Sequence, residues 1–265
     1  MVIHRNITRT ILNSTESTYQ TQTPSSAALT FELAMGVDSF YVGFREKFQS
    51  RYIHLGTANT NPSSLSIKYW NGTAFTDVTD PIDQTLGFTQ SGFISWTNEP
   101  DWQKSTQAPV TEELYWIEIT VTADLSIGTT LQSLLNLFCD EGLVRAYYPE
   151  LILDARYLPS SSTDFTEQLV AAKDLVVTKL KQQGRIDDES QIIDVNEVSI
   201  AAVHAFAWVV RNPIAVSETD RELSDRSYND FVRELTQIKF DIDQDNSGEI
   251  ESWENNRVPI FIPRL

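Results

Sequence analysis

Apolar and polar residues tend to alternate over residues 1–125, the period expected of strands that bury one face. In "LYWIEITVTA", for example, Tyr115, Ile117, Ile119 and Val121 share one face. Further strands are predicted for "ALTFELAM", "DSFYVGFRE", "SRYIHLG", "SLSIKYW" and "SGFISWTN". Six or more strands separated by turn residues favour an antiparallel β-sandwich of the jelly-roll or immunoglobulin type. Asn71-Gly72 predicts a two-residue hairpin turn, because such turns need positive φ angles.

The period changes to a helical one in the second half of the chain. Residues 126–162 are predicted to hold a short helix, "TTLQSLLNLF", and a linker with the Pro-Ser-Ser-Ser run at 159–162. Residues 163–257 are then predicted to form a small helical bundle, so the chain is predicted to be an α+β protein with more than one domain. Its first helix is expected to start at Asp164 and Glu167 and to stop at Gly184, with a buried face of Phe165, Leu169, Ala172, Val176 and Leu180.

Two more helices complete the predicted bundle. Asp194 with Glu197 marks the start of a helix that includes "SIAAVHAFAWVV" and ends at Asn212-Pro213. This run is apolar nearly all round, so we expect it at the centre of the bundle. A long third helix is predicted from about Thr219 to Phe240, opened by Thr219 and Glu222.

The segment "DIDQDNSGEIESWE" matches the spacing of a twelve-residue calcium loop over residues 243–254. Gly248 takes the position of the sharp turn and Ile250 that of the buried apolar residue. The oxygen ligands would come from Asp243, Asp245, Ser247, Glu249, Glu251 and Glu254. The alternative is an acidic turn that binds no ion. No helix can follow the loop beyond Pro259, so the pattern favours a structural EF-hand-like clip over a calcium sensor, which needs two helices.

The formal net charge of −17 is spread over both halves of the chain. Binding to nucleic acid needs clustered Lys and Arg, so a nucleic-acid-binding surface is not expected. A run of eighteen or more apolar residues does not occur, so we expect no membrane span. The segment "MVIHRNITRT" lacks the apolar run of a signal peptide, and the lone Cys139 fits a reducing compartment.

The sequence offers no recognisable catalytic constellation, and we expect no enzyme activity. His204 has Ala, Val, Phe and Trp as sequence neighbours, which favours a core or interface histidine over a catalytic one. Four tryptophans allow an alternative interpretation, in which the β-domain binds carbohydrate and sugar rings stack on exposed indole rings. They are Trp70, Trp96, Trp102 and Trp116, and the alternative is that they fill the core.

Several segments together resemble the head-to-tail adaptor (connector or neck) proteins of tailed bacteriophages. They are "LFCDEGLVRAYYPELI", the helical stretch from "DFTEQLVAAKDLVV" to "AFAWVVRNP", the long helix and "DQDNSGEIESWE", over about residues 137–257. The segment "IKYWNGTAFTDVTDPIDQTLGFTQSGFISWTNEPDW" is similar to β-domains of phage tail and neck proteins. Smaller adaptors lack both the N-terminal β-domain and the calcium loop.

The resemblance implies a virion structural protein, made in the host cytoplasm and located at the neck. It implies a ring, commonly of twelve copies, that docks under the portal protein, contacts other neck and tail proteins and continues the DNA channel. An acidic lining would let DNA slide through without specific binding. Candidates for that lining are Glu218, Asp220, Glu222, Asp225, Asp230 and Glu234.

The extended tail, residues 258–265, is apolar up to Arg264. We expect it to add to a neighbour's sheet or to enter a groove on the portal, through Pro259, Ile260, Phe261, Ile262 and Leu265. The competing hypothesis for the whole chain is a calcium-stabilised carbohydrate-binding protein, or a tail or baseplate β-sandwich protein.

Overall fold

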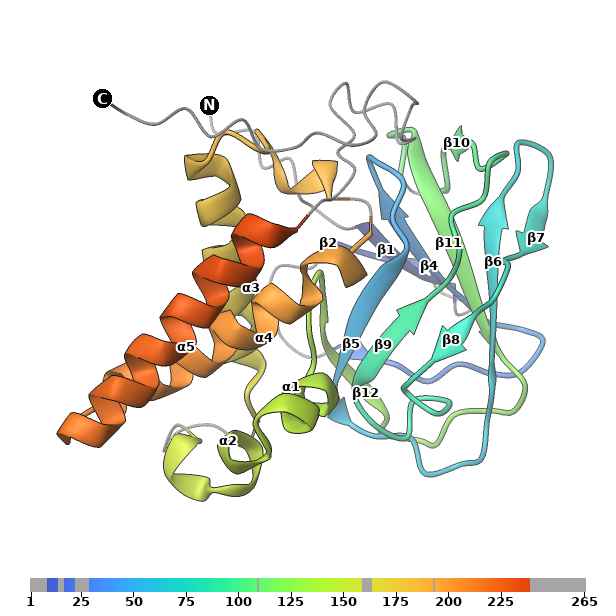
Figure 1. The fold of residues 1–265 in the computed structure, drawn as a ribbon. Coiled ribbons are helices and arrows are strands. Elements are labelled where there is room, and N and C mark those ends of the chain that lie inside the picture. The colour runs from blue at the N-terminus through green and yellow to red at the C-terminus, as the bar shows by residue number, and fades with distance from the viewer. Residues whose placement is uncertain are drawn as a thin grey trace. The chain divides into compact units, whose positions relative to one another are not determined.

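The computed structural model describes residues 9–13, 17–21, 29–108, 110–158, 164–192 and 194–238. The chain divides into two compact units, Met1–Asn136 and Leu137–Leu265, which we call unit 1 and unit 2. Among the described residues, unit 1 holds strands and unit 2 holds helices (Figure 1). The predicted α+β class, with antiparallel sheets before helices, is confirmed.

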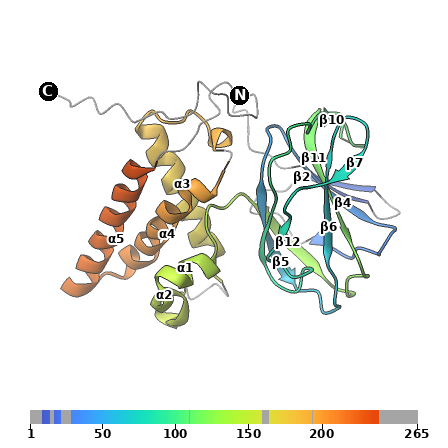
Figure 2. The same ribbon diagram turned by 45° about the vertical axis from the view of Figure 1, so that its right-hand side comes forward.

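Unit 1 contains two antiparallel sheets (Figure 2). The first has the order β2-β1-β4-β11-β6-β7, with β10 paired to β11. Its strands are β1 (Arg9–Asn13), β2 (Ser17–Thr21), β4 (Ser39–Phe44), β6 (Leu65–Trp70), β7 (Phe75–Asp77), β10 (Lys104–Ser105) and β11 (Leu114–Val121). The second has the order β3-β12-β5-β9-β8. Its strands are β3 (Leu29–Thr30), β5 (Ser50–Thr57), β8 (Ile82–Asp83), β9 (Gly92–Ser95) and β12 (Thr130–Leu135).

Both sheets contribute side chains to one hydrophobic cluster, the main core of unit 1. The first sheet supplies Leu12, Phe40, Val42, Phe44, Ile67, Tyr69, Ile117, Ile119 and Val121. The second supplies Ile53, Leu55, Ile94, Leu131 and Leu134. Burying one face of each sheet accounts for the alternation seen in the sequence.

The predicted short helix "TTLQSLLNLF" is wrong, because Thr130–Leu135 forms strand β12. Register shifts interrupt its pairing with β5 on both sides of Leu131, which disturbs the simple alternation of a strand. Leu131, Leu134 and Leu135 are all buried as a result, at a spacing that resembles a helix. Unit 1 therefore extends to Asn136, past the predicted boundary at residue 125.

The predicted two-residue turn at Asn71-Gly72 is also wrong. Trp70 pairs with Phe75, so the loop between β6 and β7 has four residues, 71–74. The side-chain oxygen of Asn71 accepts hydrogen bonds from the backbone N–H groups of Thr73 and Ala74, at 3.0 and 2.9 Å. Gly72 has φ +95°, so the positive backbone angle expected of this glycine is present.

Among its described residues, unit 2 contains three longer helices after two short ones (Figures 1 and 2). The helices are α1 (Glu141–Tyr147), α2 (Pro149–Leu153), α3 (Thr166–Gln182), α4 (Asn196–Arg211) and α5 (Glu218–Gln237), with single turns η1 (Ala155–Tyr157), η2 (Glu189–Gln191) and η3 (Asn212–Ile214). Helix α4 packs against both α3 and α5, and nine of its residues are buried. The apolar run predicted to be central is therefore central.

Helices α3 and α4 start two residues after the predicted Asp164 and Asp194, and Phe165 and Val195 are their N-cap residues. Asp164 and Asp194 accept hydrogen bonds from the N–H groups of Thr166 and Asn196, respectively. The face predicted for α3 is buried throughout, at Phe165, Leu169, Ala172, Val176 and Leu180. Gly184 follows that helix with φ +66°, as expected of a helix-ending glycine.

The long helix starts earlier than predicted and is capped by a different pair. Ser217 and Asp220 form the capping box of α5, in place of Thr219 and Glu222. The helix is described to Gln237, and its last turn is followed by Ile238. Residues 239–265 lie outside the described residues.

Candidate functional site

Helix α5 carries all six of the acids predicted to line a channel, and the structure divides them into two groups. Glu218, Glu222 and Asp225 are exposed on the first turns of the helix. Their spacing of four and three residues places them on one face. None of the three makes an ion pair within the described part of the chain. They form an acidic row at the start of α5.

The other three acids are held by neighbouring groups on the same helix. Asp220 accepts hydrogen bonds from the hydroxyl and the N–H of Ser217, which lower the pKa of its carboxyl group. Asp230 lies 2.9 Å from Arg233 and 3.9 Å from Arg226. Glu234 lies 3.5 Å from Arg233. All three of these acids are partly buried. The later turns of α5 present a more balanced charge, because Asp230 and Glu234 lie beside Arg226 and Arg233.

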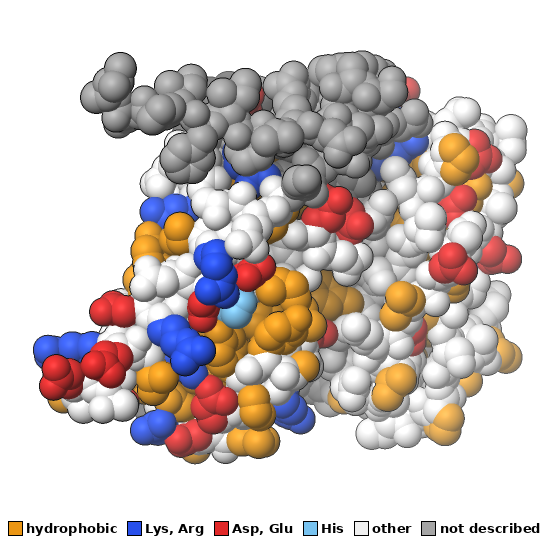
Figure 3. Space-filling view, viewed as in Figure 1, with side chains coloured by type: hydrophobic (Ala, Val, Ile, Leu, Met, Phe, Trp, Pro, Cys, Tyr) orange, Lys and Arg blue, Asp and Glu red, His pale blue; other side chains and the backbone are white. Residues whose placement is uncertain are grey.

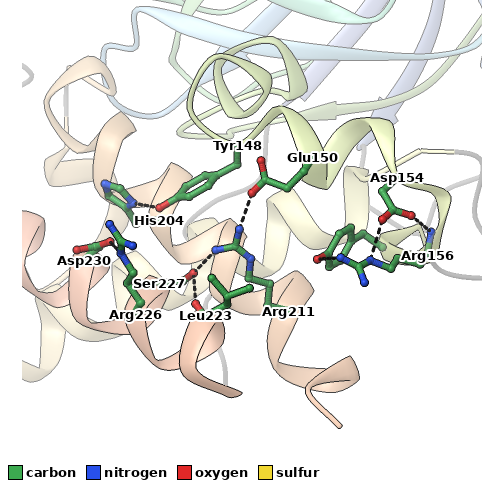
Figure 4. A network of polar contacts seen from close by, with 11 residues as sticks. Tyr148, Glu150, Asp154, Arg156, His204, Arg211, Leu223, Arg226, Ser227 and Asp230 are labelled. Atoms are coloured by element: carbon green, nitrogen blue, oxygen red, sulfur yellow. Dashed lines mark hydrogen bonds and ion pairs between the residues drawn. The ribbon is translucent and has the colours of Figure 1, made fainter. Parts of the chain in front are cut away.

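Arg211, at the end of α4, braces three helices (Figure 4). One guanidinium nitrogen donates to the hydroxyl of Ser227 on α5 at 2.7 Å, and another pairs with Glu150 on α2 at 2.5 Å. The guanidinium also lies 5.0 Å from the centre of the Tyr148 ring. Because this buried cation is shared among three elements, it fixes α2 and α5 against the end of α4.

His204 is half-buried and lies against polar groups that its sequence neighbours do not reveal. The hydroxyl of Tyr148 lies 2.6 Å from Nδ1 of the imidazole (Figure 4). Burial, followed by the nearby charge of Asp230, raises the pKa of Tyr148. A neutral phenol can donate its proton to Nδ1 when the imidazole is neutral and carries its own proton on Nε2. The interaction therefore ties the α1–α2 junction to α4.

Burial lowers the pKa of His204, although Asp230 and Glu234 oppose the shift and Arg233 adds to it. A histidine whose pKa is lowered by folding stabilises the folded state fully above its ordinary pKa near 6.5, and loses that contribution as the pH falls below it. We expect thermal unfolding of unit 2 to show this loss between pH 7.5 and 5.5. The His204→Gln variant keeps a neutral polar side chain and should lose less stability over the same range. Equal losses in the two proteins would contradict the assignment.

Arg185, between α3 and α4, closes the end of α5. Two of its guanidinium nitrogens donate to the backbone carbonyls of Leu235 and Ile238, each at 2.6 Å. The last carbonyls of a helix lack partners within the helix, and a cation there also favours the helix dipole. Burial lowers the pKa of Arg185, but an arginine remains charged at neutral pH. The position from which the chain leaves α5 is therefore set by the α3–α4 connection.

The tryptophans of unit 1 do not form the predicted sugar-stacking platform together. Trp96, Trp102 and Trp116 are buried, and only Trp70 of the four is partly exposed. Trp96 and Trp102 pack with Phe48 in the main core. Trp116 lies on the opposite face of the first sheet, in a second cluster with Ile11, Val110 and Leu114.

The predicted metal ligands, residues 243–254, and the predicted partner-binding tail, residues 258–265, lie outside the described residues. Within the described residues, no group of three or more His, Cys, Asp or Glu side chains could hold a metal ion. No helix in that part of the chain is long and apolar enough to cross a membrane.

The residues that organise this site were not singled out from the sequence. Arg211 and Glu150 lie 61 positions apart, and Arg185 lies 50 positions from Leu235. Such contacts leave no periodic signal in a single sequence. The only local signal was a basic residue, Arg211, in the last turn of α4.

No protein-family model and no curated protein matches the chain.

Proposed function

We propose that the chain is a virion structural protein of a tailed bacteriophage, a head-to-tail adaptor whose ring docks under the portal and continues the DNA channel. The observation that carries the proposal is the acidic row of α5, with Glu218, Glu222 and Asp225 exposed and unpaired within the described residues. Carboxylates on a channel wall repel DNA phosphates, so the duplex is not retained as it passes.

The braced bundle supports a mechanical, non-catalytic role. Arg211 holds α5 at its middle and Arg185 holds it at its C-terminal end, so the acidic row is carried on a helix that is fixed at two points. We propose a homo-oligomeric ring of about twelve copies, in contact with the portal and with other neck and tail proteins. Unit 1, which we interpret as a β-sandwich because both sheets share one core, would lie at the periphery of the neck.

Electron microscopy of the purified protein mixed with its portal protein tests this proposal. We expect rings bound to one face of the portal, with unit 2 next to the channel. A chain that stays monomeric with the portal and is missing from the neck of intact particles would overturn it. A free adaptor can be monomeric before assembly, so the portal must be present in the experiment.

We further propose that residues 243–254 bind a structural calcium ion just beyond the clamped end of α5. Calcium takes six to eight oxygen ligands, and the ligand positions of the loop supply that chemistry. The bound ion would fix the direction of the tail that follows, and would leave α5 itself unchanged.

Asp243→Ala and Glu254→Ala are each expected to lower the melting temperature in calcium and to change it little in a chelator, because ligand binding stabilises only the folded loop. Calorimetry with and without calcium provides the measurement. Asp225→Ala is the matched control, since it removes the same charge from an exposed site on α5. Identical melting of the unmodified protein in calcium and in chelator would remove the ion from the proposal.

The carbohydrate-binding alternative has no comparable support. Three of its four aromatic residues are buried, and a stacking platform needs exposed rings.

A further inference from the structure

Four aliphatic side chains near the start of α5 are exposed, and we call them the α5-start patch. Val216 is 82% exposed and Leu153 72%, whereas Ile214 and Leu223 are each 38% exposed. Leu153 ends α2, Ile214 lies in η3, Val216 precedes α5 and Leu223 lies in its second turn. Exposed aliphatic residues from three neighbouring elements are typical of a binding surface.

Described contacts bring these elements together. Arg211 joins Glu150, one turn before Leu153, to Ser227, whose hydroxyl donates to the backbone carbonyl of Leu223 at 2.8 Å (Figure 4). Ile214 and Val216 lie three and five residues after Arg211 in the chain, and η3 packs against both α4 and α5. The patch is therefore built on elements that Arg211 holds together.

Acids border the patch. Glu218 and Glu222 of the acidic row are exposed on the first turns of α5, whereas Glu150 and Asp154 on the α2 side are already paired with Arg211 and Arg156. Figure 3 shows hydrophobic side chains among charged ones in this region, at the lower left. A partner with apolar residues and positive charge would match both features of the surface.

The chain itself contains a segment with those properties. Residues 257–264, "RVPIFIPR", have two arginines and no acid, in a chain of net charge −17. Between the arginines stand only apolar residues, with prolines at 259 and 263 that restrict the backbone. A short apolar segment with restricted backbone freedom loses less conformational entropy when it binds.

We propose that residues 257–264 of one copy bind the α5-start patch of a neighbouring copy. The apolar residues of the segment cover Leu153, Ile214, Val216 and Leu223, and its arginines face Glu218 and Glu222. The proposal deepens the proposed ring, on which it rests, because it names the contact that links one subunit to the next. A head-to-tail contact of this kind generates a ring when the rotation from one copy to the next closes.

The length of the linking chain limits how the segment can bind the patch of its own copy. The patch lies at the start of α5, and the 20 residues of that helix separate it from the C-terminal end by about 30 Å. With residues 243–254 wrapped around an ion, residues 239–242 and 255–256 remain between Ile238 and Arg257. Six extended residues span about 20 Å, which leaves Arg257 short of Val216 on the same copy, whereas Ile262 is within reach, so the double variant below is needed to distinguish the two cases.

Disulfide trapping in calcium tests the contact with the full chain. Two single variants, Val216→Cys and Ile262→Cys, are mixed, oxidised mildly and separated on a non-reducing gel. We expect a linked pair of chains that contains one of each variant. Cys139 does not interfere, because it is buried and its burial raises the pKa of the thiol. Changing Arg257 and Arg264 to Glu in the Ile262→Cys chain should lower the yield several-fold.

The matched control is Ile127→Cys, which places a thiol at an exposed site in unit 1 and should give no linked pair with Ile262→Cys. A linked pair in the control as well, or none with Val216→Cys, would overturn the proposal. So would a compact, internally linked monomer in the double variant Val216→Cys, Ile262→Cys without linkage in the mixture. Rings seen with the portal but no trapping would reject this contact and leave the proposed function standing, whereas trapping without rings would reject the function alone.

Discussion

Replacing Phe231 by alanine is expected to lower the free energy of unfolding of unit 2 by about 3–5 kcal/mol. Phe231 is fully buried on the face of α5 that packs against α4. Its removal leaves a cavity that the helices cannot close, since Arg211 holds α5 at Ser227 and Arg185 holds it at Leu235, on either side of Phe231. Urea unfolding followed by far-ultraviolet circular dichroism measures the helical transition.

The control for Phe231→Ala is Thr236→Ala, an exposed position on the same helix. Its effect should stay within about 0.5 kcal/mol. Hydrogen exchange resolves the two units, and we expect protection in unit 1 to be unchanged because its core is separate. A loss of less than about 1 kcal/mol would show that α5 is not packed as described.

The second large effect is expected in unit 1, where Trp116→Ala should cost about 3–5 kcal/mol. The indole is fully buried, and its N–H donates to the carbonyl of Ser105 at 2.9 Å. Gly43 on the neighbouring strand leaves the space for this ring, since a Cβ there would lie 2.5 Å from a ring carbon. Gly43→Ala alone should therefore cost about 1–3 kcal/mol through overpacking.

A double-mutant cycle separates this explanation from a general effect on the strand. In the Trp116→Ala background the ring is gone, so Gly43→Ala should add almost no further loss of stability. Urea unfolding of the four proteins, monitored through the remaining tryptophans, gives the coupling energy. Additive losses would mean that the glycine is needed for a reason other than the ring.

The helical half of the fold could be predicted closely because its signals are local. An acid before each of α3 and α4, a buried face at helical spacing and Gly184 each act over a few residues of one helix. Strand β12 was missed because its bulges place three leucines at helical spacing. The turn after Trp70 was mispredicted because the Asn71 side chain organises a longer loop than the Asn-Gly pair suggests.

The candidate site could be predicted only in part. The acids of α5 were identified, but the sequence could not show that Asp230 and Glu234 contact arginines while Glu218, Glu222 and Asp225 remain exposed. That division depends on which side of α5 faces α4. The burial of Trp96 and Trp102 was equally hidden, since indole rings occur both in cores and at binding surfaces.

The contact between Arg185 and the last carbonyls of α5 determines which groups resist a pull on the C-terminal end of the helix. A pull on the segment beyond Ile238 would reach the guanidinium and the α3–α4 connection, as well as the final turn of the helix. Two charge-assisted hydrogen bonds would have to break before α5 could begin to unwind from that end. Tension on the C-terminal segment is thus shared across the bundle and does not fall on the last turn of α5 alone.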